Sequence, residues 1–119
     1  MKIAVTATGK DLDSPVDPRF GRAAYILIVD ADTLAFDVLD NAENVNAFKG
    51  AGIQAASMIS DHHADVLLTG FCGPNAFKTL EAAKVKVAGD VGGTVREAVA
   101  AFVEGNVNLV SEPNAQGHW

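Results

Sequence analysis

Two arginines precede an apolar run in a chain that is acidic as a whole. Arg19 and Arg22 bracket a Phe-Gly pair in the sequence DPRFGRAAYILIVD, residues 17–30. The chain has 119 residues and a formal net charge of −6, so we do not expect nucleic-acid binding through a basic stripe. Guanidinium groups bind anions through several N–H donors. The pair therefore indicates an anion site, the alternative being that Arg19 only pairs with Asp17 within its loop.

Three further segments place glycines directly before an expected helix. They are KGAG at 49–52, GFCGPN at 70–75 and GDVGGT at 89–94. Glycine leaves backbone N–H groups uncovered, and the start of a helix carries partial positive charge. One such loop is usually only a sharp turn, but several at one sheet edge favour an anion site. None matches a nucleotide-binding glycine pattern, so we expect no nucleotide.

The single cysteine, Cys72, lies in the second of these loops. A lone cysteine forms no internal disulfide and no zinc site, and it favours a reducing cytoplasm. Beside a helix start its thiol would have a lowered pKa and could ligate a metal, the alternative being a small buried apolar residue. His62 and His63 end an expected helix away from these loops. His118 has no partner at metal-ligand spacing, so no histidine is assigned to the site.

The apolar pattern predicts the elements that position these loops. Short β-branched runs predict strands at 2–8, 24–30, 34–40, 64–70 and 85–89. Helical spacing predicts helices at 49–63, 73–83 and 94–105. Thr94 and Glu97 form an expected capping box, and Gly105 is the expected C-cap. The short turn at 31–33 predicts an antiparallel hairpin between the second and third strands.

This order predicts one α/β domain over residues 1–105, followed by a mobile C-terminal tail at 106–119. Right-handed crossovers give a three-layer domain with a five-stranded mixed sheet, strand order 3-2-1-4-5, strand 2 antiparallel and three helices on its two faces. Ligands bind such sheets beyond the carboxyl ends of the parallel strands. Four loops should meet there, at 9–22, 41–52, 70–75 and 90–94.

This expected loop cluster lacks the parts of a hydrolase. It offers hydroxyl groups but no histidine to act as their base. No run approaches the roughly 20 apolar residues of a membrane helix, and the first residues look like a strand and not like a signal peptide. We therefore expect a cytoplasmic, monomeric binding protein with no enzymatic activity and no membrane or nucleic-acid partner.

Four segments together resemble the dinitrogenase iron-molybdenum cofactor biosynthesis family: DPRFGRAAYILIVD, KGAGIQAA, LLTGFCGPNAFKTL and GTVREAVAAF. The resemblance runs from about Met1 to Gly105. It implies a ribonuclease H-like fold and a role in carrying or inserting metal-sulfide clusters. The family members that this chain resembles most would hold a molybdenum–copper sulfide cluster without covalent attachment. The resemblance also implies P-loop ATPases of the Mrp or MinD type as partners.

A cluster of this kind is a multiply charged anion with a soft sulfide surface. It requires N–H donors, cations and polarizable or apolar walls, whereas an iron–sulfur cluster would require several cysteines. Arg19, Arg22 and Lys49 are the expected cations, and Phe20, Phe71 and Phe77 the expected walls. The predicted cluster-binding residues are Ser14, Arg19, Phe20, Arg22, Lys49, Gly50, Gly52, Phe71, Cys72, Gly73, Asn75, Gly92, Gly93 and Thr94, with Cys72 as the candidate metal ligand.

Two alternatives stay open. The chain could be a regulatory or partner-binding module that acts with P-loop ATPases, with cluster binding secondary. It could also be a hydrolase, which only the ribonuclease H-like topology suggests, and topology alone does not establish an activity.

Overall fold

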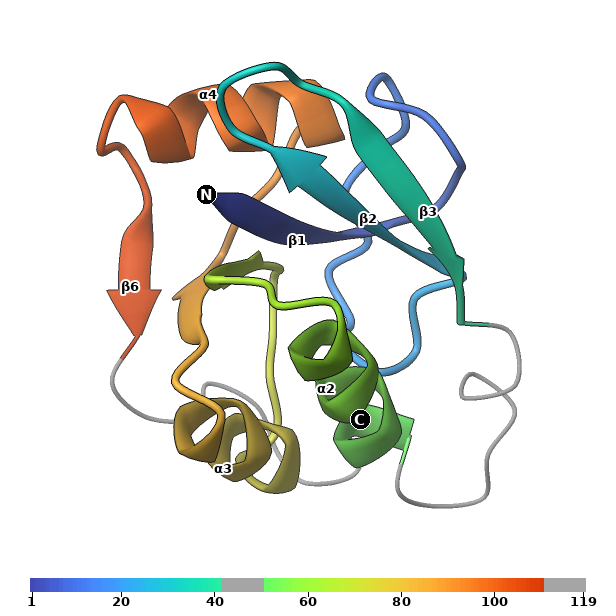
Figure 1. The fold of residues 1–119 in the computed structure, drawn as a ribbon, viewed down its shortest axis with the longest axis vertical. Helices are drawn as coiled ribbons and strands as arrows, with labels where there is room; N and C mark the ends of the chain where they lie inside the picture. The colour runs from blue at the N-terminus through green and yellow to red at the C-terminus, as the bar shows by residue number, and fades with distance from the viewer. Residues whose placement is uncertain (42–50, 111–119) are drawn as a thin grey trace.

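The computed structural model describes residues 1–41 and 51–110, and Figure 1 shows how their elements are arranged. The strands are β1 (Lys2–Ala7), β2 (Tyr25–Asp30), β3 (Phe36–Asp40), β4 (Val66–Leu68), β5 (Lys86–Gly89) and β6 (Asn108–Val110). The helices are α2 (Ala51–Asp61), α3 (Pro74–Ala82) and α4 (Val95–Val103). These elements form one mixed sheet with helices packed against it.

The sheet has the order β3-β2-β1-β4-β5-β6. β1 pairs in parallel with β4, and β4 pairs in parallel with β5. β2 is antiparallel to both β1 and β3. The predicted order 3-2-1-4-5 and the antiparallel second strand are therefore confirmed.

The predicted count of five strands is wrong, because β6 adds a sixth strand at the far side of β5. It runs antiparallel to β5 and pairs Val110 with Val87 and Leu109 with Ala88. β6 lies in the segment 106–119, which was predicted to be a mobile C-terminal tail. Its apolar run, Leu109-Val110, is short and lies between Asn108 and Ser111, so it gives little periodic signal. β6 forms because it can pair with the open edge of β5, and the local sequence does not indicate this pairing.

Helices cover both faces of the sheet, which gives three layers. Figure 1 shows α4 above the sheet and α2 and α3 below it. Alternate residues of a strand point to opposite faces, so Ala4 of β1 joins the apolar cluster under α2 and α3 while Ile3 joins the cluster under α4. Burial on both faces explains why the central strands are almost entirely apolar.

The start of α4 confirms the predicted capping box. The Thr94 side chain accepts a hydrogen bond from the Glu97 N–H at 3.1 Å, and the Glu97 carboxylate accepts one from the Thr94 N–H at 3.0 Å. The two residues thus satisfy two backbone donors that a helix start otherwise leaves open. In the part of the chain that is described, no helix is both long and apolar enough to cross a bilayer.

Candidate functional site

The loop that follows β1, residues 8–24, is joined to the start of α4. The Val16 N–H donates to Gly93 O at 2.9 Å, and the Arg96 N–H donates to Leu12 O at 2.8 Å. Pro15 pairs with Thr94 in an antiparallel bridge. These bonds fix the path of the β1 loop across the carboxyl end of β5.

The same loop is joined to the connection between β4 and α3. The Phe71 N–H donates to Pro18 O at 2.7 Å, and the Phe20 N–H donates to Phe71 O at 3.1 Å. A Cβ atom added to Gly70 would lie 2.7 Å from Cα, Cβ and O of Pro18. Only glycine permits this approach of the two backbones.

A third set of bonds joins the two helix-entry loops to each other. The Asp90 N–H donates to Gly70 O at 2.9 Å, and the Val91 N–H donates to Thr69 O at 3.0 Å. Three of the four predicted loops therefore form one continuous structure at the carboxyl ends of β1, β4 and β5, which we call the rim (residues 8–24, 69–75 and 90–94). Residues 42–50 of the fourth loop, which include Lys49 and Gly50, lie outside the described residues.

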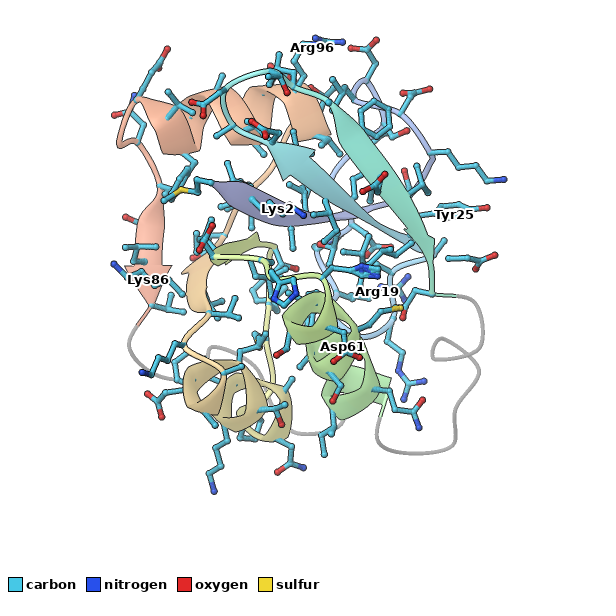
Figure 2. The ribbon with its side chains drawn as sticks, viewed as in Figure 1. Lys2, Arg19, Tyr25, Asp61, Lys86 and Arg96 are labelled. Atoms are coloured by element: carbon cyan, nitrogen blue, oxygen red, sulfur yellow. The ribbon has the colours of Figure 1, made fainter. Side chains whose placement is uncertain are left out.

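Arg19 is an exposed cation that is tied to a buried acid. Its Nε lies 3.6 Å from Oδ1 of Asp17, and that carboxylate also accepts the Arg19 backbone N–H at 3.0 Å. Figure 2 shows Arg19 on the same side of the view as Tyr25, which begins β2, and on the side away from Lys86, which begins β5. The predicted pairing with Asp17 is confirmed, yet the guanidinium is half exposed and can still contact a ligand.

Arg22 is half buried and follows a sharply turned glycine. Gly21 has φ +92°, and the Arg22 N–H donates to Arg19 O at 3.2 Å. The side-chain amide of Asn41, which is buried at the end of β3, donates to Gly21 O at 3.3 Å and to Ala23 O at 2.8 Å. Asn41 thus fixes the turn that carries Arg22.

Lys10 and Asn41 lie in two of the predicted loops, but sequence reasoning did not include them among the site residues. The Lys10 ammonium lies 5.4 Å from the centre of the Tyr25 ring, within the range of a cation–π contact. The one signal for Asn41 was its position as the polar residue that closes the third predicted strand. For Lys10 the only signal was its place in the first predicted loop.

The thiol of Cys72 is buried, contrary to the prediction of an exposed soft ligand. Desolvation by burial raises the pKa of this thiol to about 12, from an ordinary value of 9.0. Its Sγ lies 3.7 Å from Gly73 O, and the side chain belongs to the apolar cluster under α2 and α3. The loop turns the side chain inward, so burial outweighs any effect of the helix start. The alternative of a small buried apolar residue is the one that the structure favours.

Two of the three predicted aromatic walls are also in the core. Phe20 is 1% exposed and Phe77 is buried, whereas Phe71 is 37% exposed at the rim. The Ser14 hydroxyl is used within its own loop, where it donates to the Asp11 carboxylate at 3.2 Å. Gly52 lies inside α2, and a Cβ atom there would lie 3.0 Å from Cβ of Ala76 in α3. These contacts give Phe20, Ser14 and Gly52 structural roles.

The starts of α3 and α4 at the rim differ in whether side chains cap their backbone N–H groups. Gly73 is the N-cap of α3 and has no side-chain cap, and Asn75 in the first turn is exposed. At α4 the capping box already uses the N–H groups of Thr94 and Glu97. Gly92 and Gly93 are exposed beside it. The start of α3 is therefore the better anion donor of the two.

The described residues hold no group of three or more His, Cys, Asp or Glu side chains that could bind a metal ion. His62 and His63 follow the end of α2, close to where the Asp65 N–H donates to Lys2 O at the start of β1. This is the end of the sheet opposite the rim, as predicted, while His118 lies outside the described residues. The rim can thus hold an anion through cations and N–H groups, but it offers no set of covalent metal ligands.

Comparison with known proteins identifies relatives of the chain. A family model described as dinitrogenase iron-molybdenum cofactor matches residues 1–105. The apo form of the orange protein from Desulfovibrio gigas is similar over 96% of each chain, with 49% identity and a TM-score of 0.93. A Thermotoga protein of the DUF35 family, provisionally assigned as a NifB protein, is 35% identical over 98% of each chain, with a TM-score of 0.83.

A more distant structure shows the fold alone. It is a Methanocaldococcus jannaschii protein provisionally assigned as a dinitrogenase, with 20% identity and a TM-score of 0.70 over 95% of this chain and 97% of that one. No curated protein matches the sequence. All described rim residues lie inside the segment that the family model matches, whereas β6 lies beyond it.

Proposed function

Because the chain belongs to the dinitrogenase iron-molybdenum cofactor family, we propose that it is a non-catalytic carrier of an anionic molybdenum sulfide cluster. Family membership and the similarity to the orange protein support a cofactor-binding or carrier role. The molybdenum content, a molybdenum–copper sulfide composition and the lack of turnover are our proposal, as are a ribonuclease H-like classification and a monomeric, cytoplasmic protein.

The observation that carries the proposal is the contrast between the exposed cation and the buried thiol at the rim. Arg19 is half exposed, whereas Cys72 is fully buried with its pKa raised to about 12. A protonated, buried thiol is a poor metal ligand because metals bind the thiolate. A cluster held here would be bound through charge and hydrogen bonds to its sulfide surface, without a protein thiolate.

The rim residues would bind the cluster through both charge and shape. Arg19 and Arg22 would oppose the negative charge of the cluster, with Lys49 as a third cation. The backbone donors of Gly73 and Asn75 at the start of α3, and of Gly92 and Gly93 before α4, would contact sulfide atoms. Phe71 would supply an apolar wall. Because the three loops are hydrogen-bonded to one another, these groups are held in place before the ligand arrives.

Reconstitution tests the proposal directly. Apo-protein mixed with tetrathiomolybdate and copper(I) should develop an intense visible absorption that elutes with the protein on gel filtration. The double variant Arg19→Ala/Arg22→Ala should lose most of this coloured fraction. Lys86→Ala is the control for charge loss away from the rim: it removes one positive charge, where the double variant removes two, and it lies at the start of β5.

Two results would contradict the proposal. Colour that forms equally without protein, or that never elutes with it, would exclude cluster binding. Equal losses in the rim variant and in Lys86→Ala would mean that the cluster responds to overall charge and not to the rim.

The competing proposal is a regulatory module that acts with P-loop ATPases of the Mrp or MinD type. Pull-down of such an ATPase by the apo-protein, unchanged when cluster is added and unchanged in the rim variants, would favour that module over a carrier.

A further inference from the structure

The outer edge of β3 is an open sheet edge in the described structure. β3 is an edge strand of the sheet, and β2 is its only partner strand among residues 1–41 and 51–110 (Figure 1). None of its five residues is buried. The opposite edge strand, β6, has only three residues, so β3 offers the longer free edge.

The backbone groups at this edge alternate in direction. At one end of the hairpin the Asp30 N–H donates to Ala35 O at 2.8 Å, and at the other the Asn41 N–H donates to Ala24 O at 3.0 Å. In an antiparallel pair, hydrogen-bonded residue pairs alternate with non-bonded ones. Asp37 and Leu39 therefore turn their backbone groups toward β2. Phe36 and Val38 turn theirs outward, where the described part of the chain supplies no partner.

Residues 36–38 of β3 alternate between apolar and acidic types, and Leu39 and Asp40 follow them. Phe36 and Val38 are 37% and 38% exposed, and they pair with Val29 and Leu27, which lie on the α4 face of the sheet. Asp37 pairs with Ile28 on the α2 face. At residues 36–38, a strand added outside β3 would meet two apolar side chains on one face and an acid between them on the other.

The charged residues of the β2–β3 hairpin all have one sign. The sequence contains no lysine or arginine between Arg22 and Lys49. The described part of that stretch carries four acids, Asp30, Asp32, Asp37 and Asp40. Pairing with a second copy of β3 would bring like charges together across the new ladder, which is unfavourable. The edge is complementary to a basic strand.

We propose that the outer edge of β3 binds an extended segment of another protein in which apolar and basic residues alternate, and that this segment adds a strand to the sheet. Its backbone bonds to Phe36 and Val38, its apolar residues cover those two side chains, and its basic residue lies opposite Asp37. This inference does not depend on the proposed function, because the edge and the rim can be tested separately.

A peptide titration tests the proposal. The probe is a short capped peptide of alternating lysine and valine, and the control peptide carries glutamate in place of lysine. Amide shifts and slowed hydrogen exchange should concentrate at Phe36 and Val38 with the lysine peptide only. Asp37→Lys should weaken its binding roughly tenfold and allow the glutamate peptide to bind, since a cross-strand attraction becomes a repulsion.

Asp32→Lys is the matched control, because it makes the same charge change in the hairpin turn and off the strand. It should weaken the lysine peptide much less than Asp37→Lys does. Equal effects of the two variants, or shifts spread over the whole acidic surface, would overturn the proposal. Concentration-dependent dimerisation through β3 would also overturn it, since a second copy would then be the occupant.

Discussion

The rim and the outer edge of β3 use their backbone groups in opposite ways. At the rim, loops from three places in the sequence bond to one another, so that Gly70, Phe71 and Gly93 all have backbone partners within the rim. At the edge, Phe36 and Val38 direct their backbone groups away from the sheet. The rim carries exposed arginine, whereas the charged residues of β3 are both acids, Asp37 and Asp40.

This difference indicates two kinds of ligand. A rim held by its own hydrogen bonds presents a fixed set of cations and N–H donors, which suits a compact, rigid anion. An open edge presents a repeating row of backbone groups, which suits an extended chain.

The largest expected difference is in thiol reactivity. Cys72 lies buried beneath the rim, and its pKa is raised to about 12. A cysteine at an edge position should keep an ordinary pKa. In the variant Cys72→Ala/Val38→Cys the thiol should react with iodoacetamide at pH 8 some 10²- to 10³-fold faster than Cys72 does in the native protein. Similar rates for the two thiols would show that the rim opens freely to solvent.

The raised pKa of Cys72 also gives stability a pH dependence. The unfolded chain loses this proton near pH 9.0, while the folded chain keeps it until about pH 12. The contribution of the protonated thiol to the free energy of unfolding is therefore complete below pH 9.0. It is lost as the pH rises from 9.0 to about 12. Urea unfolding measures this effect across the pH window. The free energy of unfolding should fall with pH in the native protein because of Cys72, and Cys72→Ala should lack that part of the fall.

The next largest effect is at the closest contact between two rim loops. Gly70→Ala would place a Cβ atom 2.7 Å from the Pro18 backbone, and we expect the free energy of unfolding to fall by about 1–3 kcal/mol, as for other overpacking substitutions. Gly92→Ala is the matched control, because a Cβ atom there meets nothing within 4 Å. Chemical denaturation measures both. Equal stability of the two variants would mean that the rim loops are not held against each other.

Removing a positive charge at the rim should have a smaller effect than the changes above, and it should weaken cluster binding without changing the fold. Arg22→Ala should weaken cluster retention about tenfold, or about 1.4 kcal/mol, and Arg19→Ala by less, because Arg19 is exposed and its charge is screened by solvent, whereas Arg22 is half buried. His62→Ala should leave retention unchanged. The measurement is the fraction of cluster that stays with the protein after dilution. A larger effect of His62→Ala would move the site to the opposite end of the molecule.

The smallest effect is expected at the edge. Phe36→Thr keeps a residue that favours strands and removes an exposed apolar side chain, so the free energy of unfolding should change by no more than about 0.5 kcal/mol. The same variant should weaken the lysine–valine peptide. A large loss of stability in urea would mean that Phe36 belongs to the core and not to a binding edge.

Much of the fold could be predicted from local patterns in the sequence. Buried strands such as β1 are continuous apolar runs, and the capping box at Thr94 and Glu97 is a local motif that the structure confirms. β6 could not be predicted this way, because its three residues form a strand only by pairing with β5. Helix and strand patterns can be read from neighbouring residues, whereas the pairing of β6 with β5 is a tertiary contact that a local pattern does not show.

The rim could be predicted only in outline. Its place at the carboxyl ends of the strands follows from topology, and three of its loops meet there. Which side chains face outward depends on the path of each loop. Phe20 and Cys72 turn into the core while Phe71, beside Cys72 in the sequence, is exposed. The bond from Asn41 to the Arg22 turn joins residues about twenty positions apart, and no local pattern indicates it.

Binding of an anionic cluster at the rim can be tested by mapping amide shifts in the apo-protein as tetrathiomolybdate and copper(I) are added. We expect the shifts to concentrate in residues 8–24, 69–75 and 90–94, and we expect Arg22→Ala to weaken the response. Shifts centred on residues 61–64, at the end of α2, would contradict it.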